Sequence, residues 1–466
     1  MRSHLHIAAL VCALIASSVA RAGQLEPLGL DDAVAYALAH HPTVRAQSAT
    51  ADEQRAQVGV ARAGYLPHVD ASVQLDVGTG NVLRGPLFST SNIPAISGPP
   101  IGRSLSDASF GTLVGVGASW DALGLAQQIA QVDAALASEK QARAGVAVQR
   151  LNVAYAAADQ FLDLLSRDEV VRAANASVER ARALAKIVDV LVQQQLRPGA
   201  DSSRAQAELA LAVTQLIHAQ QSDDVSRTAL ARALGAAGSV VRVRADNLMA
   251  PLQPSTPATQ STVNPLVAQA DAAVRVAEAQ KRAVQFQYLP RLNVVAALWV
   301  RGSGLTNGTG AGSLPPSPND GLTTDTPNWA AGLVLTWPAL EAVAIHARSR
   351  AAEARLDVAR AQRADVDQAV QSQIDTARQV LDAAHRTAAN TPVALNAARA
   401  AESQATARYR AGLASVIEVA EAQRLLAQAE ADDAVARLDV RRAELLLARA
   451  VGDLDPFFAQ TRAGGH

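Results

Sequence analysis

Few residues of this chain have the types and the spacing that catalysis, metal binding or phosphate binding requires. The pair His40-His41 is a candidate metal site, but adjacent helical residues point about 100° apart, and no further ligand follows three or four residues later. We therefore interpret this pair as part of a turn. Gly-x-Gly sequences beginning at Gly78 and Gly302 resemble phosphate-binding loops, yet neither precedes a helix, as such a loop must. Because no nucleophile–base pair is evident and Cys12 is the only cysteine, the sequence predicts no enzyme, cofactor or metal site.

The elements available to position a site are not those of a compact enzyme. Aromatic residues are only 3% of the 466 residues, whereas hydrophobic residues, led by alanine, are 49%. This composition suits helices that approach one another closely rather than a thick core. The formal net charge of −1 predicts no general attraction to nucleic acid.

Residues 1–22 have the organisation of a secretory signal. Arg2 precedes an apolar stretch from Ile7 to Ala20, which is shorter than the roughly 20 residues needed to span a bilayer as a helix. A small-x-small sequence predicts cleavage after about Ala22. Cys12 lies inside the apolar stretch behind a poor lipobox, so lipidation is not expected.

The rest of the chain is a duplication. Tyr65-Leu66-Pro67 returns 223 residues later as Tyr288-Leu289-Pro290, and His41-Pro42 returns in the same register as Asn264-Pro265. Solenoid repeats have periods of roughly 20–50 residues, so this is one large unit present twice. The expected organisation is a first repeat over 23–245, a proline-containing linker over 246–262, a second repeat over 263–452 and a tail over 453–466.

Each repeat contains two segments that alternate between apolar and polar residues. In 68–77 the apolar residues share one face and the polar residues share the other, which is the pattern of a half-buried strand. Segments 110–120, 292–300 and 329–337 show related patterns, although Trp299 and its neighbours blur the polar face of the third. Four strands of about ten residues are too few to close a barrel, but they have the length of tilted strands in an outer membrane.

Aromatic residues on these strands are candidates for the girdles that flank the membrane. Trp329 and Trp337 lie eight residues apart on one face, roughly 26 Å along a strand, which is close to the height of a barrel's apolar band. Phe110 and Trp120 bound the second strand in the same way. A soluble sandwich would alternate too, but it needs more strands and a partner sheet. The Gly/Ser/Pro-rich loops, about 81–108 and 303–327, are expected at the surface.

Long helical runs follow the strands, over 121–195 and 339–409. Apolar residues recur at steps of three and four, with Pro392 as the one expected irregularity. At 1.5 Å per residue the first run would span about 110 Å. Helices of this length indicate coiled-coil packing against neighbours rather than a globular core.

Shorter helices return from each long helix, over 202–235 and 415–451. An opening helix over 30–63, with Asp31 or Asp32 as its cap and an interruption at Pro42, is about as long as the first return. These lengths predict a wall in which long helices alternate with stacked pairs of short helices. From Gly199 to Gly235 the first return measures 36 residues, whereas Gly412 to Gly452 measures 40, so the two tips are not expected to be equivalent.

The breaks between long and short helices carry the most specific pattern. The second break reads Tyr409-x-x-Gly412-x-x-Ser415-x-x-Glu418-x-x-Glu421-Ala422-Gln423 and is closed by Gly452; the first reads Arg197-Pro198-Gly199-Ala200-Asp201, then Arg204-Ala205-Gln206 and Leu234-Gly235. Together with the duplicated frame, these motifs resemble the TolC-like outer-membrane efflux protein family over residues 28–452.

This resemblance implies a mixed α and β membrane protein: a coiled-coil α-helical periplasmic barrel plus four strands per chain, which join in a homotrimer to form a 12-stranded outer-membrane barrel. It implies a passive exit duct for tripartite efflux or type I secretion. The implied partners are outer-membrane lipid, a periplasmic adaptor (membrane fusion) protein and an inner-membrane pump. It places Glu418, Glu421 and Tyr409 at a periplasmic gate and Gly199 and Gly412 in the helix-tip turns. Some family members have a basic residue two positions after the tip glycine, where this chain has Ala414.

A secreted or periplasmic coiled-coil scaffold is the competing interpretation. It explains the long helices but leaves the four amphipathic strands and the paired tryptophans without a purpose. Glu418 and Glu421 would then be two solvated glutamates on one helix face, three residues apart.

Overall fold

The computed structural model describes residues 27–79, 108–245, 248, 263–303, 317–337 and 341–463. The expected signal over 1–22 lies outside these residues, as do most of the linker and most of both Gly/Ser/Pro-rich loops. The chain divides into two compact units. Unit 1 comprises 1–50, 142–270 and 363–466, and unit 2 comprises 51–141 and 271–362.

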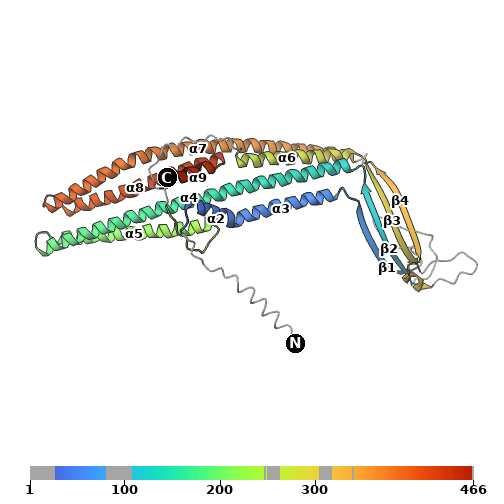
Figure 1. Cartoon of the computed structure of the whole chain (residues 1–466), viewed down its shortest axis with the longest axis horizontal. Coiled ribbons are helices and arrows are strands. Elements are labelled where there is room, and N and C mark those ends of the chain that lie inside the picture. Colours follow the sequence, from blue (N-terminus) through green and yellow to red (C-terminus); the bar gives the residue numbers. More distant parts are fainter. Residues whose placement is uncertain are drawn as a thin grey trace, which may run out of the picture. The chain divides into compact units, whose positions relative to one another are not determined.

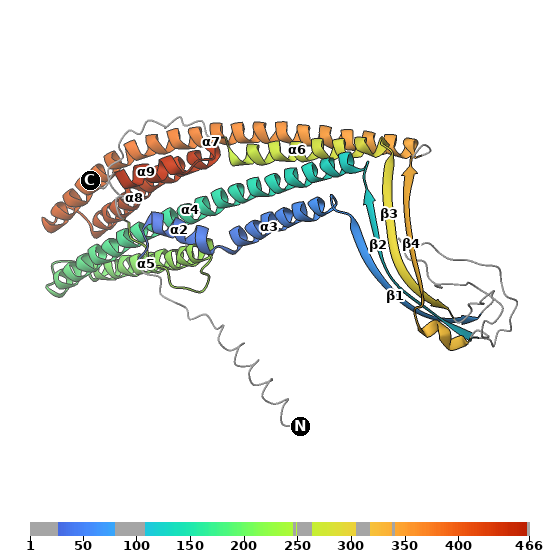
Figure 2. The same ribbon diagram turned by 45° about the vertical axis from the view of Figure 1, so that its right-hand side comes forward.

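Unit 2 contains one antiparallel sheet in the order β1-β2-β3-β4, shown side by side in Figure 2. Its strands are β1 (His68–Thr79), β2 (Ala108–Asp121), β3 (Arg291–Ser303) and β4 (Thr326–Thr336). All four predicted strands are therefore present, and the alternating pattern located each to within a few residues. A short 3₁₀ helix, η3 (Pro318–Leu322), precedes β4.

The pairing register puts the apolar residues of all four strands on the same face. One row across the sheet runs from Ala71 through Val116 and Leu298 to Trp329. In the single chain this row is largely exposed, to 49% at Val116 and 75% at Trp329. A one-residue slip between any two strands would break this face, so the shared register matches a sheet that presents one apolar surface.

The opposite face of the sheet explains the irregular third strand. Trp299 and Ala297 are buried there beside Leu113. Their cross-strand partners on β2 are Gly115 and Gly117, which have no side chains to compete for this space. The residues that blurred the polar pattern therefore form a small cluster on the face opposite the exposed apolar one.

The repeated Tyr-Leu-Pro sequence lies where helix α3 (Pro42–Ala63) meets β1. The indole Nε1 of Trp120, at the end of β2, donates to the carbonyl oxygen of Tyr65 at 3.2 Å. In the second repeat, helix α6 (Pro265–Gln285) ends in a 3₁₀ turn, η2 (Phe286–Tyr288), directly before Pro290 and β3. Because proline disfavours helical conformation in the preceding residue, the motif converts a helix into a strand at both places.

The helices of the two repeats match closely in length. The long helices α4 (Leu125–Gln193) and α7 (Ala342–Arg410) each have 69 residues, or roughly 100 Å. The helix predicted over 121–195 is longer than α4, because β2 continues to Asp121 and α4 begins only at Leu125. Helix α7 continues through Pro392. Within the described residues, no helix is both long enough and apolar enough to cross a bilayer.

The return helices α5 (Gly199–Ala233) and α8 (Val416–Val451) run beside α4 and α7 in unit 1 (Figures 1 and 2). The ends of the short helices confirm the predicted stacking. A Cβ atom on Gly235 would lie 2.9 Å from Cα of His41, and one on Gly452 would lie 2.7 Å from Cδ of Pro265. Each return helix thus ends against the start of another short helix, α5 against α3 and α8 against α6. The contact leaves no room for a side chain on either glycine.

Two further helices complete unit 1: α2 (Leu30–His40) and α9 (Asp455–Ala463). Neither Asp31 nor Asp32 is the N-cap residue of α2. Gly29 occupies that position and donates its backbone N–H to Asp32 at 3.4 Å. Asp31 instead binds Arg462 of α9 at 2.7 and 3.0 Å. Helix α9 lies in the segment that the sequence analysis assigned to the tail. Its two phenylalanines pack into the core shared by α2, α3, α4, α5 and α8.

The His40-His41 pair lies at a break between two helices and not in the turn interpreted from the sequence: His40 is the last residue of α2, and His41 separates it from α3. Nδ1 of His40 lies 3.0 Å from the carbonyl oxygen of Tyr36, and Nδ1 of His41 lies 2.7 Å from Oγ1 of Thr43. Among the described residues, no three His, Cys, Asp or Glu side chains gather as a metal site.

Candidate functional site

Both helix tips of unit 1 are built on the same turn. Gly412 has a φ of 76°, and Gln195 has a φ of 59° at the other tip. One residue later, the backbone N–H of Leu413 donates to Arg408 at 2.8 Å and that of Leu196 donates to Leu191 at 2.9 Å. This six-to-one hydrogen bond after a left-handed residue is a Schellman closure.

The structural counterpart of Gly412 is therefore Gln195, and not Gly199. Gly199 is the first residue of α5, behind the N-cap residue Pro198. Gln195 precedes Gly235 by the same 40 residues that separate Gly412 from Gly452. The difference of 36 against 40 residues arose because Gly199 was taken as the counterpart of Gly412. A positive φ is usually adopted by glycine, so the sequence pointed to Gly199 rather than to Gln195. A non-glycine residue at Gln195 tolerates this conformation because the hydrogen bonds of the turn hold it.

Glu418 has a structural role at the start of α8. Ser415 is the N-cap residue, and its Oγ accepts from the backbone N–H of Glu418 at 3.4 Å. In return, Oε1 of Glu418 accepts from the backbone N–H of Ser415 at 3.2 Å. This capping box satisfies two helix-end donors. The second oxygen of Glu418 lies 3.9 Å from Nη1 of Arg408.

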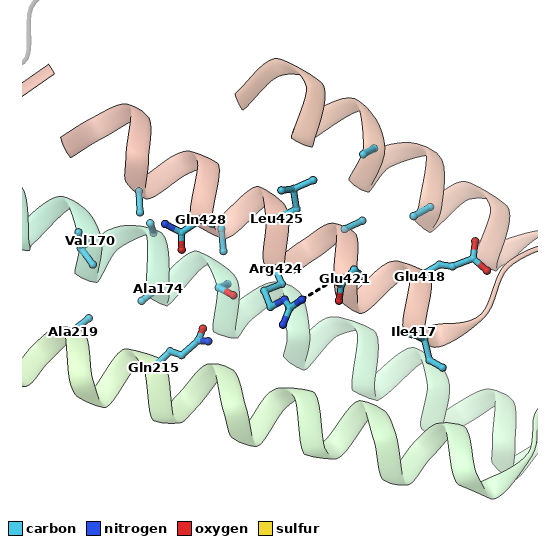
Figure 3. A pocket seen from close by; sticks show the side chains of 17 residues that line it. Val170, Ala174, Gln215, Ala219, Ile417, Glu418, Glu421, Arg424, Leu425 and Gln428 are labelled. Carbon is cyan, nitrogen blue, oxygen red and sulfur yellow. Dashed lines mark hydrogen bonds and ion pairs between the residues drawn. The ribbon is translucent and has the colours of Figure 1, made fainter. Parts of the chain in front are cut away.

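Glu418 and Glu421 both line a recess of about 930 Å³ between the helices of unit 1. Small apolar residues of α4 and α7 form much of its wall, and Gln215 of α5 and Gln428 of α8 add polar groups. Figure 3 shows Glu421 and Arg424 beside each other on α8 within this recess. Oε1 of Glu421 lies 2.5 Å from Nη2 of Arg424, with both side chains about two-thirds exposed.

The arginines change the electrostatics expected from the glutamates alone. Glu421 forms an ion pair with Arg424, and Glu418 has Arg408 nearby. Exposed pairs of this kind contribute little to stability, but they balance the local charge. The recess therefore presents paired charges rather than an uncompensated acidic surface.

Tyr409 does not line this recess. It is 2% exposed and packs in a cluster with residues of three other helices: Leu184, Val188, Ala205, Val416 and Val419. The guanidinium carbon of Arg197 lies 4.9 Å from the centre of its ring, and Nη2 of Arg197 donates to its carbonyl oxygen at 3.5 Å. Burial raises the pKa of the Tyr409 phenol, although the positive charge of Arg197 opposes this shift.

Arg197 supplies the basic group that the second tip lacks. It lies two residues after Gln195, at the position equivalent to Ala414, and reaches from the first tip to the second. The two tips of one chain are thus joined by a cation–π contact and a backbone hydrogen bond.

The comparison with known sequences accounts for this architecture. The profile of the family described as "Outer membrane efflux protein" matches residues 33–236 and 261–453, which are most of the chain and correspond to its two repeats. The chain belongs to the outer membrane efflux protein family. It is an outer-membrane efflux channel of the kind found in tripartite efflux systems, and the family is one of transport proteins rather than enzymes.

Solved structures of membrane channels and outer-membrane proteins share this fold. The outer-membrane channel OprN has 20% identity and a TM-score of 0.69, with 91% of this chain and 89% of OprN covered. VceC from Vibrio cholerae has 18% identity and a TM-score of 0.69, with 91% and 96% covered. CusC has 14% identity and a TM-score of 0.73, with 93% and 96% covered. None of the curated proteins compared with the chain matches it significantly.

The aromatic residues predicted for the girdle lie on the apolar face of this efflux protein's sheet. Trp329 is on β4, and Trp337 follows its last residue; they are 75% and 69% exposed. Trp120 and Phe110 lie on the same face of β2, where Phe110 pairs with Val77 and Trp120 with Val294.

Sequence reasoning missed Arg197, Arg408 and Arg424. Only Arg424 had a local signal, because it follows Glu421 by three residues on one helix face.

Proposed function

We propose that three copies of this efflux protein close into one 12-stranded barrel. Trimers are the form in which channels of this family work. In the described part of the chain, β1 and β4 each pair on one side only. Because the four strands alternate in direction, β4 of one copy would meet β1 of the next in antiparallel orientation. Closure is necessary because an open edge leaves backbone groups unsatisfied in lipid.

The exposed apolar face of the sheet is the observation that best supports this assembly. Residues such as Val73, 76% exposed, and Leu333, 70% exposed, would face lipid. The four aromatic residues on that face, Phe110, Trp120, Trp329 and Trp337, would lie in the membrane interfaces. The helices would continue as a periplasmic tunnel, with the signal removed after about Ala22 and no lipid attached. The expected partners are outer-membrane lipid, a periplasmic adaptor protein and an inner-membrane pump, with no nucleic acid.

The helix tips would form the periplasmic gate. Glu418 and Glu421 would line the tunnel just inside the tips, since both border the recess. Tyr409 would act from within the wall by joining the two tips through Arg197. Gly412 and its counterpart Gln195 would set the shape of the two tips, and Gly199 would be the first residue of the return helix α5.

The paired charges in the recess allow a test of whether these glutamates line the tunnel. Glu421→Gln leaves Arg424 without its partner, so three copies add three uncompensated positive charges around one axis. We expect the selectivity of the channel to shift toward anions by several-fold in permeability ratio, because a narrow aqueous passage focuses the field of its wall. Reversal potentials of single channels in planar bilayers under a salt gradient measure this shift.

Glu179→Gln is the matched control. Glu179 also pairs with an arginine three residues later, Arg182, on an exposed face of α4, but it does not line the recess. The control should leave the reversal potential unchanged. If Glu421→Gln behaves like Glu179→Gln, these glutamates are surface residues and the tunnel lining lies elsewhere.

A further inference from the structure

A second charged cluster lies in unit 1 at the junction of α4, α5 and the segment that follows α5. Its centre is Arg227 of α5. Nη2 of Arg227 lies 2.6 Å from Oδ1 of Asp168 on α4, and its Nε lies 2.8 Å from Oδ2 of Asp223. Its Nη1 donates to the carbonyl oxygen of Val241 at 3.4 Å. One guanidinium thus serves two carboxylates and a backbone carbonyl.

The hydrogen bonding of Asp223 is incomplete. The residue is 9% exposed, and among the described residues its Oδ1 is buried without a hydrogen-bond partner. A buried carboxylate oxygen without a donor is costly. The carboxyl groups of Asp168 and Asp223 are neighbours, because both bind the guanidinium group of Arg227, one at Nη2 and the other at Nε. Two carboxylates facing one cation leave an excess negative charge that one proton would remove.

Each element that packs around Asp168 and Asp223 contributes charged side chains. On α4, Arg172 binds Glu169 at 2.7 Å, and Asp163 accepts from Ser226 at 2.9 Å. Arg442 of α8 lies 3.4 Å from Asp163. Arg242 lies with Asp168 and Arg227 around a recess of about 470 Å³. Asp163 already has its own donors, so Asp168 is the carboxyl group able to supply a proton to Asp223.

We propose that Asp168 and Asp223 share one proton, so that an acid–carboxylate hydrogen bond completes the junction between α4 and α5 when the pH falls. In this form Asp168 donates to Asp223, and Arg227 neutralises the single remaining charge. The proton comes from solvent, since Asp168 is partly exposed. No bond other than the O–H bond of the carboxyl group forms or breaks.

The junction would also fix the segment that contains Leu28. Arg227 binds the carbonyl of Val241, and the adjoining residues pair with Leu28: the N–H of Leu28 donates to Arg242 at 3.0 Å and the N–H of Arg244 donates to Leu28 at 2.9 Å. Protonation would therefore strengthen the attachment of both segments to the helices. The cluster is a device by which acidification stabilises one junction of the wall.

The direction of the pH effect follows from linkage. Burial, together with the neighbouring Asp223, raises the pKa of Asp168 to about 6 from its ordinary value of 3.8, despite the opposing charge of Arg227. A carboxyl group with a raised pKa binds its proton more readily in the folded state. Folding stability should therefore increase as the pH falls through about 6, with the gain complete near the ordinary pKa.

The test uses the full-length protein in detergent and compares melting temperatures between pH 8 and pH 5. Wild type should gain about 2 °C from this pair on acidification. Asp168→Asn should flatten that gain, because its amide donates to Asp223 at every pH. Asp224→Asn is the control, since Asp224 is the exposed neighbour of Asp223 and should keep the wild-type slope. Equal slopes in wild type and Asp168→Asn would overturn the proposal.

A spectroscopic measurement keeps the proposal testable if Asp168→Asn is poorly stable. Difference infrared spectra of wild type between pH 8 and pH 5 should show the carbonyl stretch of a protonated carboxylic acid that is hydrogen-bonded to a carboxylate. Asp223→Asn and Asp168→Asn should each remove it, and Asp224→Asn should not. A signal that survives both substitutions would place the proton on another group.

Discussion

Leu333→Arg should sharply deplete the assembled channel. Leu333 is 70% exposed on β4 and pairs with Val294 on β3, within the apolar face. An arginine on the lipid face of a membrane barrel costs about 2–4 kcal/mol near the midplane, and a trimer would contain three. The measurement is the amount of SDS-resistant trimer extracted from outer membranes, relative to total chain.

Thr336→Arg is the matched control on the same strand. Thr336 pairs with Arg291, on the opposite face from Leu333. An arginine there would face the aqueous interior of the barrel and should leave much more trimer. Equal depletion by both substitutions, or by neither, would mean that the apolar face of the sheet does not meet lipid.

Arg197→Ala should open the tips. The cation–π contact with buried Tyr409 and the hydrogen bond to its carbonyl oxygen connect the two tips of one chain. A contact of this kind contributes about 1–2 kcal/mol when partly desolvated, so its loss should increase the open population roughly tenfold. Single-channel recordings should show a higher mean conductance and longer open times.

Arg410→Ala provides the comparison for this variant. Arg410 is adjacent to Tyr409 on α7 but is exposed, so its removal changes charge without touching the contact between the tips. Arg197→Lys keeps the charge while losing the planar group, and should give an intermediate conductance. If Arg197→Ala conducts like wild type, the contact packs the tips without holding them closed.

The strands and helices were predictable because each has a strong periodic pattern. Strict alternation located β1, and the repeated proline motifs located the breaks between helix and strand. The stacking of short helices was also predictable, because the helix lengths matched and Gly235 and Gly452 each preceded a break. These features are local, so they can be read from consecutive residues.

The parts that were missed depend on contacts between distant residues. Arg197 and Tyr409 lie 212 residues apart, and nothing near either residue indicates the other. Helix α9 is stable because Phe457 and Phe458 pack into a core built from five other helices. Gln195 was missed for a different reason: the turn imposes a left-handed conformation that sequence preferences assign to glycine.

The central claim is that this chain is an outer-membrane channel built from three copies. Its most direct test is to extract the protein from outer membranes, measure the mass of the detergent-solubilised complex, and record from the same preparation in planar bilayers. The account predicts a complex of three chains that conducts ions as single, stable channels. A water-soluble chain, or an extracted complex that is not trimeric or carries no current, would contradict it.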